Sequence, residues 1–178
     1  EALTHGGIAN NLRVNLVRIE SDYLKPSEIK NKLKGVSGIL ILGGFGKRGT
    51  EGKIAAISYA RKNNIPFLGI CFGMQMAVIE FARNVLNIKK ATSSEFGPSK
   101  ASVVGLMSEW TRDGKLMKGT DKDLGGTMRL GGYEARLKKD TKVSKIYNSL
   151  KINERHRHRY EVNINYKEDF ESKGMIFS

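Results

Sequence analysis

The sequence predicts an α/β fold with three layers, α/β/α, in which helices flank a mainly parallel sheet and the second half adds further strands. Three observations support this class. Short, continuous apolar runs alternate with segments of helical periodicity. Glycine-rich turns follow the apolar runs. Strand and helix alternate at the spacing of strand–helix–strand units, which favours parallel pairing with right-handed crossovers.

The first elements can be placed from their composition. VNLVRI at 14–19 is rich in valine, leucine and isoleucine, which favours a strand. The segment 26–35 opens on proline and serine and closes on glycine, which predicts a short helix. GILILGG at 38–44 is continuously apolar, so we expect a strand covered on both faces. The glycine-rich stretch 44–52 predicts a loop after it.

Two helices and a strand complete the first half. The segment 51–64 places Ile54 and Ile57 at helical spacing and ends on two asparagines. PFLGI at 66–70 predicts a second buried strand. The segment 73–86 predicts a helix whose apolar side chains share one face, namely Met74, Ala77, Val78, Phe81 and Val85.

The second half is richer in strands and contains no linker. We expect strands within 102–110, 126–137 and 155–163, and a polar, glycine-containing loop at 111–126. One domain, 1–178, therefore accounts for the chain. Because the chain starts inside a predicted helix and stops as the apolar segment GMIFS begins, we expect it to be part of a longer protein, truncated at both ends.

Composition and charge exclude several classes of protein. The 178 residues, 39% hydrophobic and 28% charged, suit one globular domain. No apolar run approaches the roughly 20 residues of a membrane-spanning helix, so we expect no membrane partner. The net charge of +13 favours anionic ligands, but the lysines are dispersed without a nucleic-acid motif, so we expect no nucleic-acid partner. A single cysteine excludes an internal disulfide and suits a reducing cytoplasm.

That cysteine, Cys71, lies directly after a predicted buried strand and directly before a predicted helix. Ligands of open α/β sheets bind at this end of the strands. The pattern Gly69-Ile70-Cys71-Phe72-Gly73 is the cysteine form of the Gly-x-Ser-x-Gly nucleophile turn, in which glycines avoid steric clashes around a strained residue. The N-terminus of the following helix favours a thiolate. The alternative is a cysteine that merely packs as a small apolar residue.

An acyl-transfer site also needs hydrogen-bond donors for an oxyanion. The backbone N–H of Phe72, next to the cysteine, is one candidate. The loop LGGFG at 42–46 follows the other buried strand, and its glycines allow a close approach of backbone N–H groups to a substrate. We expect Gly44 to supply the second donor.

Several stretches resemble, in the same order, motifs of one known family. They are EALTHGGIANN at the start, GGFGKRGTEGKI (43–54), IPFLGICFGMQMAVIEFARNV (65–85), SSEF (93–96), DLGGTMRLG (123–131) and ERHRHRYEVN (154–163). The cysteine turn is similar to that of all class I glutamine amidotransferases. The last two motifs more specifically resemble the glutaminase domain of the CTP synthase family. The resemblance covers essentially the whole chain and implies a flavodoxin-like, class I amidotransferase fold.

The resemblance also implies a function. The CTP synthase family makes CTP from UTP, ATP and glutamine. Its amidoligase domain uses ATP and magnesium, and its glutaminase domain supplies the ammonia. The resemblance implies L-glutamine and an amidoligase domain of the same chain as partners, a homotetramer in the full-length protein, and a cytoplasmic location. No cofactor is expected in this domain, whereas ATP, UTP, Mg and the effector GTP are implied for the full-length enzyme.

By the same resemblance, Cys71 would attack the side-chain amide of glutamine and form a γ-glutamyl thioester. Gly44 and Phe72 would bind the oxyanion, Glu95 the α-ammonium group, and Arg159 the α-carboxylate. The residues implied to bind glutamine are Gly44, Phe72, Gly73, Met74, Gln75, Glu95 and Arg159. Lys118 stands where the family's lid often has an arginine, which puts the response to GTP in question because lysine lacks the bidentate fork.

The base that should serve Cys71 is not evident. Class I amidotransferases use a His-x-Glu motif, and none of the three histidines, His5, His156 and His158, precedes a glutamate at that spacing. We therefore expect the triad's histidine and glutamate beyond residue 178, and we expect these 178 residues alone to be inactive. His-x-His on a strand projects two imidazoles to one face, but no further ligand cluster is visible, so we expect no metal site. Strand alternation would also place Arg155, Arg157 and Arg159 on one face.

Three alternatives stay open from the sequence. The chain could belong to another class I amidotransferase, such as the GMP synthetase type, although DLGGTMRLG and ERHRHRYEVN argue against it. A γ-glutamyl peptidase of the same fold is a weaker alternative. From a different class, a non-catalytic basic binding module would keep the fold and lack the triad.

Overall fold

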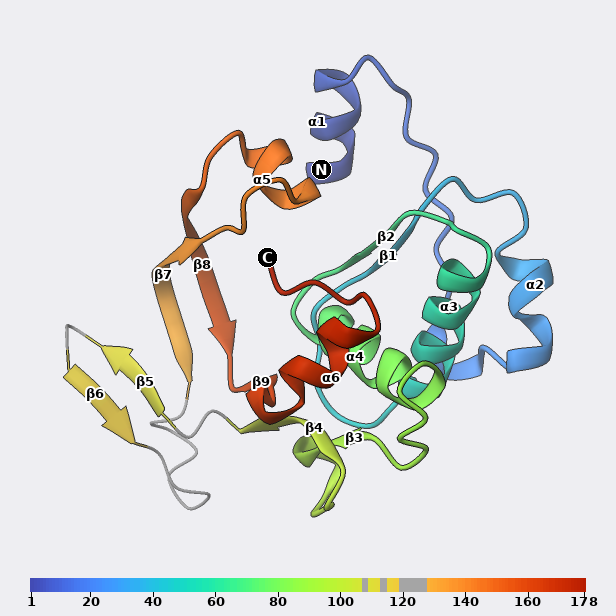
Figure 1. Ribbon diagram of the computed structural model, residues 1–178. Coiled ribbons are helices and arrows are strands. Elements are labelled where there is room, and N and C mark those ends of the chain that lie inside the picture. Colours follow the sequence, from blue (N-terminus) through green and yellow to red (C-terminus); the bar gives the residue numbers. More distant parts are fainter. Residues whose placement is uncertain (107–108, 113–114, 119–127) are drawn as a thin grey trace.

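The computed structural model describes residues 1–106, 109–112, 115–118 and 128–178, and the side chains of 1–106 and 128–178 (Figure 1). The helices are α1 (Ala2–Ala9), α2 (Ile29–Lys32), α3 (Thr50–Lys62), α4 (Phe72–Asn84), α5 (Lys142–Tyr147) and α6 (Lys167–Ser172). The strands are β1 (Ile39–Ile41), β2 (Phe67–Gly69), β3 (Thr92–Ser93), β4 (Ser102–Leu106), β5 (Glu109–Arg112), β6 (Lys115–Lys118), β7 (Arg129–Arg136), β8 (Lys151–His158) and β9 (Tyr160–Val162).

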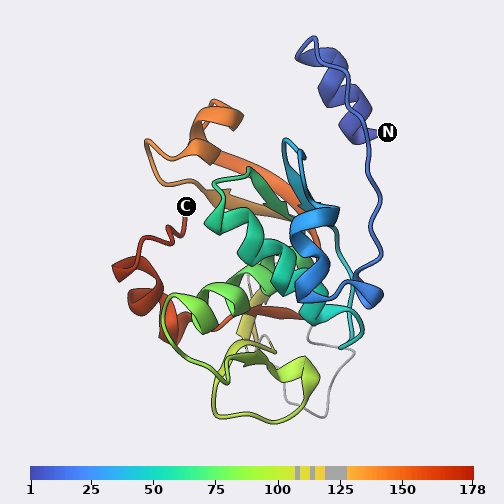
Figure 2. The ribbon, with the colours of Figure 1, turned by 90° about the vertical axis from the view of Figure 1, so that its right-hand side faces the viewer.

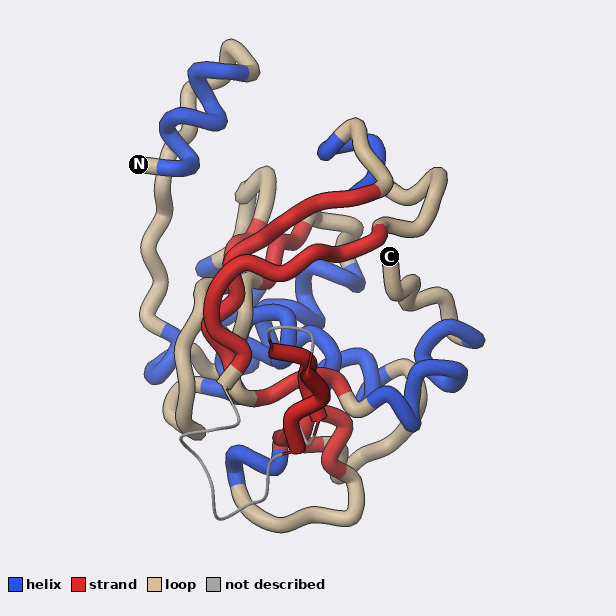
Figure 3. The backbone as a smooth tube through the Cα atoms, turned by 90° about the vertical axis from the view of Figure 1, so that its left-hand side faces the viewer, coloured by secondary structure: helices blue, strands red, loops and turns tan. Residues whose placement is uncertain are grey.

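The α/β class expected from the sequence is confirmed, but the described strands pair in both directions rather than mainly in parallel. The expectation that the first two apolar strands are covered on both faces is wrong, since Leu42 and Leu68 are 61% and 58% exposed. β1 and β2 pair in parallel, and α3 and α4 pack against them. β3 pairs in parallel with β4, which pairs antiparallel with β9. β7 and β8 form a long antiparallel ribbon beside this body (Figure 3). The expectation of a β-rich second half is therefore correct.

One core joins the two halves of the chain. Helix α4 contributes Phe72, Met76, Ile79 and Ala82, each at most 1% exposed. They pack with buried residues from the other elements, namely Ile41, Ile54, Ile57, Val103, Val104 and Phe170. Burying one such aliphatic or aromatic side chain stabilises a fold by about 1.5–3 kcal/mol. The core therefore fixes the start of α4 against β1 and β4.

The single apolar face expected for 73–86 is wrong. Met74 is 39% exposed, whereas Met76, Ile79 and Ala82 are fully buried. The reason is that α4 contacts β1 and β2 on one side, α3 on another, and β4 and β9 on a third. A helix surrounded in this way is buried around most of its circumference, so a one-sided apolar stripe does not describe it.

An ion pair between a buried carboxylate and a partly exposed guanidinium holds α3 to α4. Arg61 donates three hydrogen bonds to the carboxylate of Glu80, from Nη2 to Oε1 at 2.8 Å and from Nε to Oε2 at 3.0 Å and to Oε1 at 3.3 Å. Glu80 is 1% exposed and also accepts a bond from Asn84 at 3.0 Å. The bond to Glu80 raises the pKa of Arg61. Since every carboxylate oxygen has a partner, the charge is tolerated in the core.

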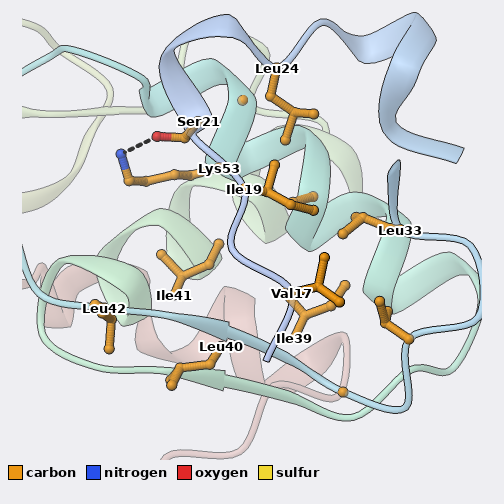
Figure 4. A pocket seen from close by; sticks show the side chains of 14 residues that line it. Val17, Ile19, Ser21, Leu24, Leu33, Ile39, Leu40, Ile41, Leu42 and Lys53 are labelled. Carbon is orange, nitrogen blue, oxygen red and sulfur yellow. Dashed lines mark hydrogen bonds between the residues drawn. The ribbon is translucent and has the colours of Figure 1, made fainter. Parts of the chain in front are cut away.

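The strand expected at 14–19 is absent. This segment is extended but has no ladder partner, and Leu16 and Val17 are 53% and 68% exposed. It runs from α1, which stands away from the body in Figure 2, toward the rest of the chain. An apolar pocket lies between Val17, Ile19 and β1, so the segment does not reach the edge of β1 (Figure 4). Valine-rich composition favours a strand only where a neighbouring strand supplies the hydrogen bonds.

The next residues attach to α3 instead of the sheet. Lys53 donates to the hydroxyl of Ser21 at 2.8 Å (Figure 4). Arg48, just before α3, pairs with Asp22. A small second core is formed by Leu24, Ile29, Leu33 and Ala56. Further along, the loop expected at 111–126 is also partly wrong, because β5 and β6 form an antiparallel pair there. No helix among the described residues is both long and apolar enough to cross a membrane.

Candidate active site

Cys71 occupies a strained turn between β2 and α4. Its backbone has φ 53° and ψ −106°, a combination outside the ordinary regions for a residue with a side chain. Such strain costs on the order of 1–3 kcal/mol and persists only where surrounding bonds hold it. Here Ile70 donates to the carbonyl of Ile41 at 2.9 Å, and Gly73 donates to that of Ile70 at 3.0 Å. The turn predicted from the sequence is therefore present, with Cys71 half-buried at its tip.

The two glycines around Cys71 are required by close backbone approach. A Cβ on Gly69 would lie 2.6 Å from the carbonyl carbon of Gly73, and a Cβ on Gly73 would lie 2.1 Å from the carbonyl oxygen of Ile41. Both distances are far below contact. The glycines thus press the start of α4 onto the ends of β2 and β1, which is the steric role expected for them.

The loop after β1 reaches the cysteine. A Cβ built on Gly43 would lie 3.6 Å from the Cβ of Cys71, and one on Gly44 would lie 3.9 Å from the ring of Phe72. Gly43 and Gly44 are exposed, so a ligand can approach them. Phe72 is the first residue of α4, and the N–H groups of a helix's first turn have no acceptor inside the helix. The glycine loop and the first turn of α4 therefore both border Cys71.

Glu95 borders the same loop. It lies in a short 3₁₀ helix, Ser94–Phe96, which is capped by the buried Ser93 hydroxyl accepting the N–H of Glu95 at 3.2 Å. The N–H of Gly46 donates to Oε1 of Glu95 at 2.5 Å. The ring of Phe96 packs edge-on against Phe72, with centroids 6.2 Å apart. The carboxylate is therefore held within reach of the glycine loop and of the start of α4.

The bend between β8 and β9 carries Arg159, the last of the charged residues expected in the site. The buried side chain of Gln75 donates to the carbonyl of Tyr160 at 2.9 Å. Burial raises the pKa of Tyr160, and the nearby Glu95 anion raises it further, while the Arg159 cation acts in the opposite direction. An anion and a cation thus both act on Tyr160, whose carbonyl is bound by Gln75, four residues after Cys71.

The remaining expected residues fall in different places. Gly73 packs beneath the turn against β1, and Met74 is partly exposed on the first turn of α4. Gln75 supports Tyr160 with a side chain that is only 3% exposed. Lys118 is the last residue of β6, and its side chain lies outside the described residues, as does the motif segment 123–127.

The histidines serve another cluster. His156 Nδ1 and His158 Nε2 lie 2.9 Å apart on one face of β8, as strand alternation predicts. Arg129 bonds Glu161 at 3.0 Å and lies over the Tyr133 ring, which contacts His156. Burial and the Arg129 cation lower the pKa of both imidazoles. No group of three metal-ligating side chains occurs within the residues that the structure describes.

None of these contacts supplies a base for Cys71. Among the described residues, the partners of His156 and His158 belong to β7, β8 and β9, and His5 is exposed in α1. The shared face expected for three arginines holds for Arg155 and Arg157, which are exposed and alternate with the imidazoles. It does not extend to Arg159, because β8 ends at His158 and the chain bends there.

Two features of the site were missed by sequence reasoning. Tyr160 follows Arg159 directly within ERHRHRYEVN, so its adjacency to the arginine was visible, but its contact with Gln75 was not. The hydrogen bond between Gly46 and Glu95 joins residues 49 positions apart. No local pattern could have predicted a contact over that separation.

Comparison with known proteins gives a consistent picture. The family model for glutamine amidotransferase class-I matches residues 1–178. The CTP synthase of Pelagibacter ubique (strain HTCC1062) is 71% identical over 178 residues, covering 100% of this chain and 33% of that protein. The CTP synthase of Zymomonas mobilis is 56% identical over 181 residues, also covering 100% of this chain and 33% of that protein. The chain thus spans about a third of the length of these curated relatives.

A solved structure agrees with the fold. The glutaminase domain of Trypanosoma brucei CTPS, with bound acivicin, superposes with a TM-score of 0.82 at 39% identity. The match covers 96% of this chain and 63% of that one. With a strained cysteine at the tip of a strand–helix turn, a glycine loop beside it, and a family model that matches from end to end, the chain belongs to the glutamine amidotransferase class-I family.

Proposed function

We propose that this chain is the glutaminase domain of a CTP synthase, which hydrolyses glutamine and supplies ammonia for the ATP-dependent amination of UTP to CTP. The names of relatives up to 71% identical over the whole chain support this assignment. The observation that carries the chemistry is the strained Cys71 turn with the glycine loop beside it, where a Cβ built on Gly43 would lie 3.6 Å from the Cβ of Cys71. The relatives' names argue against the GMP synthetase type, the γ-glutamyl peptidase and the non-catalytic module.

In the proposed reaction, the Cys71 sulfur attacks the amide carbon of the glutamine side chain. The carbonyl oxygen becomes an oxyanion that accepts hydrogen bonds from the N–H groups of Gly44 and Phe72. As the C–N bond breaks, the amide nitrogen takes a proton and leaves as ammonia, and a γ-glutamyl thioester forms. Water then attacks the thioester, which releases glutamate and restores the thiol. A histidine and a glutamate outside these 178 residues are proposed as the base and its orienting partner.

Recognition of the amino acid needs two fixed charges of opposite sign, because glutamine is a zwitterion. We assign the α-ammonium group to Glu95 and the α-carboxylate to Arg159. Both charges act on the pKa of Tyr160, which supports the proposal that Glu95 and Arg159 lie near the same residue. We also assign Phe72, Gly73, Met74 and Gln75, the first residues of α4, to the glutamine site.

The rest of the assignment concerns the longer protein. The amidoligase domain of the same chain would use ATP, UTP and magnesium, and a homotetramer in the cytoplasm is the proposed working form. Lys118 is assigned to the lid that mediates the GTP response. The relatives' greater length supports the proposal of a further domain, since this chain covers 33% of them.

The test uses the full-length protein. Replacing Cys71→Ala should reduce glutamine-dependent CTP formation by at least about 10³-fold, because the nucleophile is removed, and leave ammonia-dependent formation within about twofold. The measurement is CTP formation from UTP and ATP with either nitrogen source. Equal loss of both activities would contradict the division of labour, and CTP formation unaffected by the substitution would contradict the nucleophile.

A further inference from the structure

The loop between β1 and α3 carries Gly44, yet little holds it. Residues 42–45 are exposed, and Phe45 is 89% exposed. For residues 43–46, the described part of the structure shows one hydrogen bond to the rest of the protein, from the N–H of Gly46 to Glu95 Oε1. The later part of the loop is better anchored, since Thr50 caps onto the carbonyl of Lys47 and Arg48 pairs with Asp22.

Glu95 itself is rigidly placed. Its N–H is bound to the hydroxyl of Ser93, a residue with no exposed surface. The neighbouring Ser94 hydroxyl accepts the N–H of Leu106 at 3.2 Å, which ties the 3₁₀ helix to β4. Phe96 packs against Phe72. The anchor of the exposed end of the loop is therefore a carboxylate fixed to the core.

The bond is of a strong type and leaves room for a second partner. A backbone N–H that donates to a carboxylate makes a charge-assisted bond, roughly twice as strong as a neutral one. An ionised carboxylate has about four lone-pair sites on two oxygens. Glu95 can therefore hold Gly46 and accept a substrate ammonium group at the same time.

We propose that Glu95 is a positioning residue for the oxyanion loop: by holding the N–H of Gly46 it sets the place of the Gly44 N–H beside Cys71. This rests on the proposed function, and it assigns Glu95 a task separate from binding the ammonium group. Gly44 and Gly46 are two residues apart, so release of one displaces the other. A displacement of about 1 Å in a catalytic group can cost about 10²-fold in rate.

The two tasks of Glu95 separate when the substrate has no ammonium group. Glutaramate is glutamine without its α-amino group, so binding of an ammonium contributes nothing to its hydrolysis. In Glu95→Gln the side chain loses its charge but keeps an oxygen acceptor for the N–H of Gly46, whereas Glu95→Ala removes the acceptor. Three full-length proteins are compared on glutamine and on glutaramate: wild type, Glu95→Gln and Glu95→Ala.

On glutamine, both variants should show KM raised by on the order of 10-fold or more, because the fixed anion is lost. On glutaramate, Glu95→Gln should keep kcat within about threefold of wild type, while Glu95→Ala should lose on the order of 10–10²-fold, as expected for a displaced oxyanion donor. Equal kcat of all three proteins on glutaramate would overturn the proposal. Glu51→Gln, an exposed carboxylate of α3 paired with Arg83, is the control for the change in charge.

A second measurement covers the case of glutaramate turnover below detection. The aldehyde 5-oxopentanoate also lacks an ammonium group and adds reversibly to a thiol. The C–S bond forms as the C=O π bond breaks, and the thiol proton ends on the oxygen, which lies where the oxyanion would. Its Kd should rise on the order of tenfold in Glu95→Ala and less than threefold in Glu95→Gln. Identical Kd values would overturn the proposal.

The outcomes distinguish a failure of the positioning role of Glu95 from a failure of the proposed function on which it rests. If wild-type protein releases no ammonia from glutamine, the proposed function fails. If wild type hydrolyses glutamine but the variants do not differ on substrates without an ammonium group, only the positioning role fails. Unchanged circular dichroism and thermal unfolding of both Glu95 variants exclude misfolding as the cause of a difference.

Discussion

The cysteine turn and the β7–β8–β9 region are built by different means. Around Cys71, backbones touch at distances that only glycine allows, and buried apolar side chains surround the start of α4. Around β8, the contacts are polar and electrostatic, with an imidazole pair, an arginine–carboxylate bond and an arginine over a tyrosine ring. The difference suggests that steric changes should damage the first region and that pH should act on the second.

The steric side of this comparison gives the largest expected effect. In Gly73→Ala the new methyl group would meet the carbonyl oxygen of Ile41 at 2.1 Å, so either β1 or α4 must shift. We expect the free energy of unfolding to fall by about 3 kcal/mol, measured by chemical denaturation. Gly6→Ala, whose added Cβ meets nothing within 4 Å, is the control and should change it by less than about 1 kcal/mol. Similar losses in both variants would mean that the turn is not sterically determined.

The next largest effect concerns the buried charge of Glu80 in α4, the helix that follows the cysteine turn. Arg61→Ala would leave the Glu80 carboxylate, 1% exposed, with Asn84 alone as a partner. We expect a loss of about 2 kcal/mol in the free energy of unfolding, because a buried charge without its partner is costly. Lys32→Ala breaks an exposed pair with Glu28 at 4.0 Å and should cost at most about 0.5 kcal/mol. If the two variants unfold at the same denaturant concentration, Glu80 is compensated in another way.

The smallest effect belongs to the imidazole pair. Burial and Arg129 lower the pKa of His156 and His158 from the ordinary value of 6.5, while Glu161 and, for His156, Glu154 oppose this. The folded protein then binds fewer protons than the unfolded chain just below pH 6.5, so stability is fully present above that pH and is lost as the pH falls.

The check is thermal unfolding between about pH 7 and pH 5, compared with a variant carrying His156→Gln and His158→Gln. The parent protein should lose stability more steeply than the double variant, because only the parent has imidazoles to protonate. Parallel curves would show that carboxylates alone determine the pH dependence. A steeper curve for the double variant would reverse the sign inferred from the lowered pKa values.

Prediction from the sequence succeeded where the determining contacts are local. The turn at Cys71 needs small residues two positions on either side, and Gly69 and Gly73 are visible in the sequence. The helices at α3 and α4 follow from periodicity and flanking residues. The strand expected at 14–19 failed because its composition was suitable but no neighbouring ladder lay beside it.

The residues of the candidate site also divide into those that a local pattern predicts and those that it does not. Cys71, Gly44 and Phe72 could be predicted from two glycine-containing turns, and Glu95 and Arg159 only through resemblance to a family. The bond from Gly46 to Glu95 and the support of Tyr160 by Gln75 connect residues 49 and 85 positions apart. Contacts over such separations depend on how whole elements pack, which no short pattern encodes.

The sequence by itself therefore determined the cysteine turn. A Cβ on Gly69 would lie 2.6 Å from the backbone of Gly73, and this clash within five residues, which glycine avoids, is a local requirement that the sequence displays. Only the tertiary structure decided what surrounds that turn. Packing of α4 against β4 and β9 brings the Glu95 carboxylate to the glycine loop and the Arg159 bend to the same end of the helix. The charged residues Glu95 and Arg159 come from distant segments, and packing of the core, rather than any pattern within either segment, brings both segments to the start of α4.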